Sequence, residues 1–174
     1  MTAKLQHEEH DPKSHEVLHP KLSQVEAVVR KNVYWAMGAA LIPVPYFDIA
    51  AVGGVQLKML ADLSKIYGIK FAQNRAKSLI ATTIGSVGAV GGVAGIASMA
   101  KLIPGVGQLL GIAIAPGAAG AATYAIGQVF IKHFESGGTF LDFDIEKHRE
   151  HFQHQYTEGQ KLTADLKHAG AHGH

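Results

Sequence analysis

Two long runs without a formally charged residue constrain the fold of this chain more than any other feature. Residues 78–100 and 102–131 contain twenty-three and thirty uncharged positions, separated by one lysine. A helix needs roughly 20 apolar residues to cross the hydrocarbon core of a bilayer, so each run is long enough. The start of the second run favours a tight turn, since it contains Pro104, Gly105 and Gly107. We therefore predict an antiparallel apolar helical hairpin at about 78–131.

Glycines recur in this hairpin at the spacing of close helix contacts. The first arm holds two small-xxx-small pairs, Gly88 with Gly92 and Gly91 with Gly95. The second arm has a similar face around Gly117, next to a proline that should kink it. Glycine inside a helix costs about 1 kcal/mol relative to alanine in water, so lipid or tight packing must compensate. The same composition would suit a buried hairpin in a soluble assembly.

Polar segments flank the hairpin, and together they predict an all-α helical bundle. We divide the chain into a disordered His-rich segment at 1–15, a helical module at 16–138, an amphipathic helix at 139–168 and a disordered tail at 169–174. Within the module, helices are expected at 20–41 and 46–67. Pro45 helps to end the first helix, because proline cannot continue the hydrogen-bond ladder, and Gly68 caps the second.

Side-chain patterns support these helices. The apolar stripe expected along the first helix comprises Leu18, Leu22, Val25, Val29, Asn32 or Val33, and Ala36. Thr139 and Asp142 have the outline of a capping box for the last helix. Asp48 complements the dipole of the second helix or forms a polar anchor at the edge of the apolar body. Tyr34, Trp35 and Tyr46 suit either a bilayer interface or a protein core.

The sequence shows no pattern that predicts catalysis. The nucleotide-binding pattern G-x-x-x-x-G-K-[ST], the zinc-protease pattern H-E-x-x-H and a nucleophile–histidine–acid order are all absent, so we expect a non-enzyme without a cofactor. A net charge of +2 does not predict nucleic-acid binding. His148, His151 and His154 recur along one helix, where they form a metal site or a solvated histidine-rich face.

Several motifs resemble a known family. The segment Ile42-Pro-Val-Pro-Tyr-Phe-Asp48, the pair Gln56 and Met59, and the later Ile103-Pro-Gly-Val-Gly107 are similar to the YcjF-like, GTPase-associated family of domain of unknown function 697. The resemblance covers about residues 28–138. It implies a helical, often membrane-predicted module found beside or fused to GTPase domains. No GTPase domain is present in this sequence, so the resemblance implies a GTPase on another chain as a candidate partner.

Two functional hypotheses follow. The first is a membrane-associated bacterial module that self-associates through its glycine-rich hairpin. Basic residues mark the cytoplasmic side of membrane proteins. Lys70, Arg75, Lys77 and Lys132 flank the open ends of the hairpin, so we expect the inner membrane with the termini in the cytoplasm. The second is a soluble helical oligomer that hides the hairpin in subunit interfaces or inserts it reversibly. A histidine-rich metal-binding protein is a third, weaker alternative.

The glycine pattern leads to a prediction about assembly. Replacing Gly88 and Gly92 together by Leu should disrupt packing within the hairpin or between copies, since Leu cannot fit where two backbones nearly touch. Gly170→Leu, in the polar tail, serves as the control. Crosslinking and size analysis in mild detergent measure the effect. An unchanged oligomer distribution and thermal stability in the double variant would rule out the glycine contact.

Overall fold

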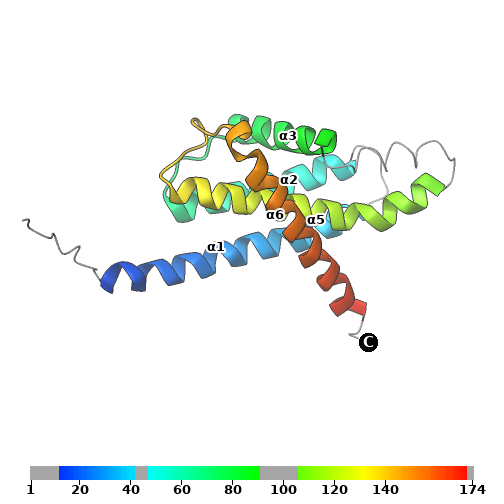
Figure 1. Cartoon of the computed structure of the whole chain (residues 1–174), viewed down its shortest axis with the longest axis horizontal. Coiled ribbons are helices and arrows are strands. Elements are labelled where there is room, and N and C mark those ends of the chain that lie inside the picture. The colour runs from blue at the N-terminus through cyan, green and yellow to red at the C-terminus, as the bar shows by residue number, and fades with distance from the viewer. Residues whose placement is uncertain (1–11, 42–46, 91–105, 172–174) are drawn as a thin grey trace, which may run out of the picture.

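The computed structural model describes residues 12–41, 47–90 and 106–171, with side chains at 21–41, 50–83 and 116–168. This part of the chain forms five α-helices and no strand, which confirms the all-α prediction. The helices are α1 (Pro12–Ala39), α2 (Phe47–Tyr67), α3 (Gln73–Val90), α5 (Val106–Glu135) and α6 (Ile145–Ala171). Figure 1 shows α5 in the middle of the bundle, with α6 crossing it steeply. The most extensive helix contacts join α5 to α6 and α1 to α5.

Helix α1 buries most of its predicted stripe. Its buried residues are Val25, Val29, Asn32, Val33 and Ala36. Leu22 was expected in this stripe but is 41% exposed, because the core contacts of α1 begin one turn later at Val25. The helix begins at Pro12, earlier than the predicted start at Pro20.

Two glycines end helices by the same backbone geometry. Gly68 has φ 69°, and the next amide, of Ile69, donates to the carbonyl of Ser64 at 2.8 Å. Gly137 has φ 83°, and the amide of Gly138 donates to the carbonyl of His133 at 3.0 Å. Both are Schellman caps, in which a left-handed residue lets the chain turn back on the last helical turn. The predicted cap at Gly68 is confirmed.

The last helix begins later than the capping-box pattern predicts. Asp142 accepts hydrogen bonds from the amide of Thr139 at 2.7 Å and from its hydroxyl, yet both residues lie in the connection between α5 and α6. The carboxylate of Asp144 instead accepts from the amide of Glu146 at 3.0 Å and caps α6. The connection turns here because Phe140 and Phe143, on either side of Asp142, are buried in the core.

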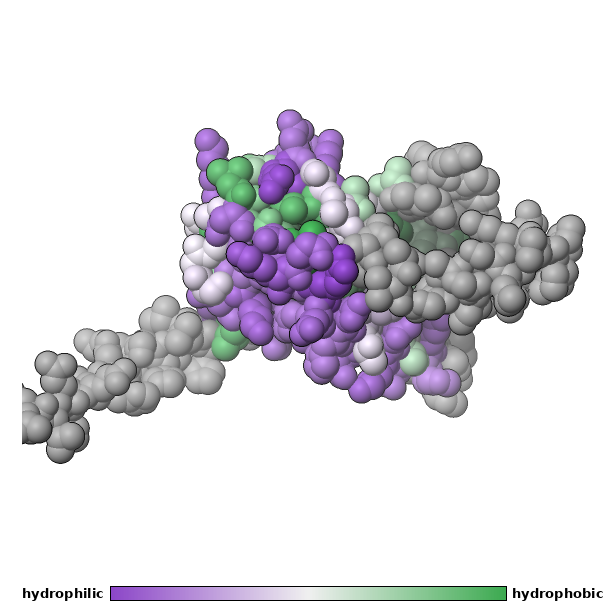
Figure 2. Space-filling model, turned by 45° about the horizontal axis from the view of Figure 1, so that its top comes forward, coloured by the Kyte–Doolittle hydropathy of each residue, from purple (hydrophilic) through white to green (hydrophobic). Residues whose placement is uncertain are grey.

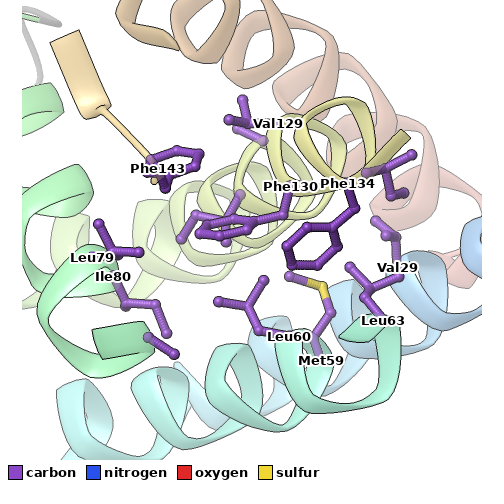
Figure 3. Close-up of a cluster of buried hydrophobic side chains, with 14 of the residues drawn as sticks. Val29, Met59, Leu60, Leu63, Leu79, Ile80, Val129, Phe130, Phe134 and Phe143 are labelled. Carbon is purple, nitrogen blue, oxygen red and sulfur yellow. The ribbon is translucent and has the colours of Figure 1, made fainter. Parts of the chain in front are cut away.

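The core is richest in aromatic side chains where α5 ends. Phe130 stacks on Phe143 with ring centroids 4.5 Å apart, and Phe134 meets Phe140 edge to face at 5.2 Å. Figure 3 shows Phe130 and Phe134 facing aliphatic residues of α2 and α3, Leu60 among them. Hydrophilic residues cover most of the described surface in the view of Figure 2, with smaller hydrophobic patches. The bundle therefore has an ordinary apolar interior enclosed by polar helix faces.

Helices α5 and α6 approach most closely at a pair of small residues. A Cβ added to Gly159 of α6 would lie 2.9 Å from both the Cα and the carbonyl oxygen of Ala121. Gly120, which precedes Ala121, lies against Met37 of α1 and against Thr163, one turn after Gly159 on α6. The predicted small-residue face of the second arm thus does pack closely, but in the described residues its partners are α6 and α1 instead of the first arm.

The close contact between α5 and α6 predicts opposite changes in stability when two glycines are replaced by alanine. Gly159→Ala should destabilise the bundle by about 1–2 kcal/mol, because α6 must move away from the Ala121 backbone. Gly117→Ala is the matched control, since its added Cβ would lie at an ordinary 3.5 Å from the Lys167 Nζ atom. That variant should gain up to about 1 kcal/mol from helix propensity. Urea denaturation measures both changes. Equal stability of the two variants would mean that α5 and α6 are not held together at Gly159.

Candidate functional site

Near one end of the bundle, four helices have stretches without formal charge, although Asp48 lies in the first turn of α2. Uncharged stretches of α1, α2, α3 and α5 meet there, as the helix ends in Figure 1 show. We define this charge-free end by the described residues 32–41, 50–57, 78–83 and 116–123. Side-chain contacts join the stretches of α1, α2 and α5, since Gly120 lies against Met37 and Gln56 donates to Thr123. On α3, Ser78 and Thr82 line a pocket together with residues 141–145 of the connection between α5 and α6.

The surface of this end is exposed but uncharged. Its exposed residues are Tyr34, Trp35, Gly38, Leu41, Ala50, Gly54, Ser78, Ala81 and Thr82. Trp35 is 63% exposed and Leu41 is 58% exposed, which is unusual for such large apolar side chains. The core placement that the sequence left open does not apply to Tyr34 and Trp35, since both are exposed. Helix α6 crosses one face of this end and carries its own charged residues.

The opposite end is polar, and side-chain contacts of Tyr67 join its helices. The Tyr67 hydroxyl donates to Glu135 at 3.1 Å, and the Lys21 ammonium lies 4.3 Å from the centre of the Tyr67 ring. Burial and the neighbouring Glu135 carboxylate raise the pKa of Tyr67 well above its usual range, so the phenol stays protonated and donates. One aromatic ring therefore joins α1, α2 and α5 at the polar end.

The predicted residues Gln56 and Met59 hold α2 against α5. Both are fully buried. The Gln56 Nε2 atom donates to Thr123 Oγ1 at 3.2 Å, while its Oε1 atom has no hydrogen-bond partner among the described residues. Met59 lies against Gly127 of α5, which leaves room for its sulfur. The two positions of this motif thus act in packing, one turn apart on the same face.

The other predicted interaction residues are spread over the chain. Asp48 lies in the first turn of α2, Gly88 in α3 and Gly107 in the first turn of α5. Gly117 lies near Thr163 and Lys167 of α6. The predicted residues outside the described part are Pro45, Gly91, Gly92, Gly95, Pro104 and Gly105. Sequence reasoning missed Gly159, because a single glycine in a polar helix gives no sign of a close contact.

The three predicted metal ligands do not form a metal site. The His148 Nδ1 atom donates to the carbonyl of Asp144 at 2.7 Å, and its ring stacks on Phe143 at 4.7 Å. His151 is half-buried, and burial together with nearby Lys132 lowers its pKa. His154 is exposed. Within the described ranges, no group of three or more histidine and acidic side chains could hold a metal ion.

A different histidine, which the sequence did not single out, lies beside His148. His133 is buried, and its Nε2 atom donates to the Thr139 carbonyl at 2.9 Å. Its ring meets that of His148 edge to face, with centroids 5.2 Å apart. Gly138 leaves the space for this ring, since an added Cβ would lie 2.4 Å from it. These histidines therefore shape the connection between α5 and α6.

The described helices do not include the predicted membrane spans. Residues 116–131 of the second run form the buried middle of α5, where none is exposed. Across the residues that the structure describes, no helix combines the length and the apolar character needed to cross a membrane. Glycine, alanine and threonine dilute the larger apolar residues in both runs.

Comparisons with known proteins place these features in a wider context. The family model described as "Domain of unknown function (DUF697)" matches residues 6–161. The chain is 42% identical over 143 residues to magnetosome membrane protein 22 of Magnetospirillum gryphiswaldense, an alignment that covers 82% of this chain and 73% of that protein. No solved structure matches the chain.

The buried contact between Gln56 and Thr123 leads to a double-variant test. Gln56→Leu should be neutral or stabilising by about 1 kcal/mol, because it removes a buried carbonyl without a partner among the described residues. Thr123→Val should destabilise by about 1–3 kcal/mol, since it leaves the Gln56 amide unpaired. Thermal unfolding of both single variants and the double variant measures the coupling. If Gln56→Leu lost as much stability as Thr123→Val, the Gln56 Oε1 atom would have to have a hydrogen-bond partner.

Proposed function

This chain belongs to the DUF697 family, and we propose that it is a non-enzymatic helical module that attaches to a membrane by its charge-free end. The observation that carries the proposal is the gathering of four uncharged helix stretches with exposed Trp35 and Leu41. An exposed surface of this kind marks a membrane or protein contact in water-soluble folds. The name of the related magnetosome membrane protein supports the membrane as the partner.

The aromatic residues suit this role by their chemistry. Tryptophan and tyrosine rings concentrate at membrane interfaces, where an apolar ring contacts acyl chains and a polar edge remains hydrated. Tyr34 and Trp35 are exposed on α1, in its last two turns. The polar end, tied by Tyr67 and Glu135, then faces the aqueous side.

The finer parts of the proposal concern assembly and orientation. We propose that copies associate through the small residues around Gly88, Gly91, Gly92 and Gly95, and that the polar helices present a surface to a partner in the cytoplasm. A GTPase on another chain is the candidate that the family resemblance suggests. The membrane is the bacterial inner membrane, with both termini on its cytoplasmic side.

Exposed apolar residues at the two ends provide the test. The double variant Trp35→Ser with Leu41→Ser should bind phospholipid vesicles at least about tenfold more weakly, because each side chain loses on the order of 1 kcal/mol of burial in the bilayer. The control is Leu22→Ser with Leu141→Ser, which removes exposed side chains outside the charge-free end. Vesicle flotation measures the bound fraction, and thermal unfolding shows that both variants fold.

Two results would contradict the proposal. Equal flotation of both double variants would show that the charge-free end does not contact lipid. Wild-type protein that stays in the aqueous fraction as a defined oligomer would favour the alternative, a helical assembly that covers this surface with other subunits.

A further inference from the structure

Charge is distributed unevenly between the body of the chain and its two terminal parts. Residues 27–134 contain nine basic and two acidic side chains, whereas the rest of the chain contains seven basic and twelve acidic ones. The near-neutral total of +2 therefore hides a body with a positive excess of seven charges. From Leu63 to Phe134 every formally charged residue is basic.

Four of the positive charges of the body border the uncharged stretches of the four helices. On each helix, the charged residue that borders the uncharged stretch on the side of the polar end is a lysine. These residues, which we call the lysine border, are Lys31 of α1, Lys58 of α2, Lys77 of α3 and Lys132 of α5. All four are exposed.

Packing contacts place the lysine border at a similar height along the bundle. Val29 of α1 and Met59 of α2 both lie against Gly127 of α5, and a border lysine follows or precedes each within two residues. Leu79 of α3 belongs to the same buried cluster as Phe130, which lies one turn further along α5 (Figure 3). The border therefore spans roughly 10 Å along the bundle axis, at a rise of about 1.5 Å per residue.

The nearest acids lie on the side of the polar end. Asp62 forms an ion pair with Lys58 at 2.6 Å, and Glu26 and Glu135 follow further from the charge-free end on α1 and α5. Helix α3 contains no acidic residue. Moving from the charge-free end to the polar end, α1 and α5 thus change from uncharged to basic and then to mixed charge, and α3 changes from uncharged to basic. Helix α2 differs, since Asp48 lies in its first turn.

We propose that the lysine border binds the anionic headgroups of a phospholipid bilayer into which the charge-free end is placed. This inference rests on the proposed membrane attachment and adds the class of lipid. A lysine at the edge of an apolar surface extends its aliphatic stem along that surface and its ammonium group toward the headgroups. Each lysine near an anionic leaflet strengthens binding severalfold, and the effect falls off within a Debye length.

Vesicle binding with charge-reversed variants tests the inference. Lys31→Glu with Lys77→Glu reverses two border charges, and Lys70→Glu with Lys147→Glu reverses two exposed charges at the polar end with the same change in net charge. Wild type should bind phosphatidylcholine vesicles containing phosphatidylglycerol at least about tenfold more tightly than pure phosphatidylcholine vesicles. The border variant should lose this preference, while the control should keep most of it. High salt should reduce the preference of wild type.

The possible outcomes distinguish the lysine border from the proposed membrane attachment on which it rests. Equal binding of wild type to both vesicle types would overturn the lysine border and leave membrane attachment standing. Binding to neither type would overturn both. An equal loss in the border and control variants would show a general effect of net charge and would likewise overturn the border. Thermal unfolding of the two variants, whose changed residues are exposed, confirms that each is folded.

Discussion

The contact between Ala121 and Gly159 is the constraint on which the rest of the bundle depends. Two helix backbones approach there to a distance that excludes a single methyl group, so α6 lies directly on α5. Without this contact α6, which is polar along most of its length, would have little apolar surface with which to pack. Its close approach brings Phe152 into the core and completes the enclosure of α5. The crossing thus turns an apolar helix into the centre of the fold.

The two ends of the bundle are built on different principles. At the polar end, Schellman caps at Gly68 and Gly137 reverse the chain tightly, and the aromatic cluster around Phe130 fills the interior. At the charge-free end the interior is made of small residues, and large apolar side chains such as Trp35 lie outside. A fold that needed only water as its environment would be expected to place these side chains the other way round. This inversion is the basis of the proposed membrane attachment.

Local patterns in the sequence predicted much of the fold, but they did not predict features that depend on packing between distant residues. The stripe of α1 and the cap at Gly68 follow from helix periodicity and backbone conformation, which depend on near neighbours. The start of α6 was missed, because burial of Phe140 and Phe143 keeps the capping pair at Thr139 and Asp142 in a connection.

For the second apolar run, the sequence left a membrane span and a buried helix open as alternatives. Composition cannot distinguish a helix surrounded by lipid from one surrounded by other helices. Gly159 shows the same limit, since its importance comes entirely from the residue it meets.

The buried amide of Gln56 has a consequence for how α2 can sit on α5. An apolar side chain at this position would tolerate several alignments of the two helices, because apolar contacts have little directionality. The amide finds a partner only where Thr123 lies opposite, and a shift of one turn would leave it unpaired among aliphatic groups. Gln56 therefore selects one register for the helix pair out of several with similar packing. Because Lys58 lies two residues after Gln56 on α2, the same hydrogen bond sets the height of Lys58 relative to Lys132 of α5.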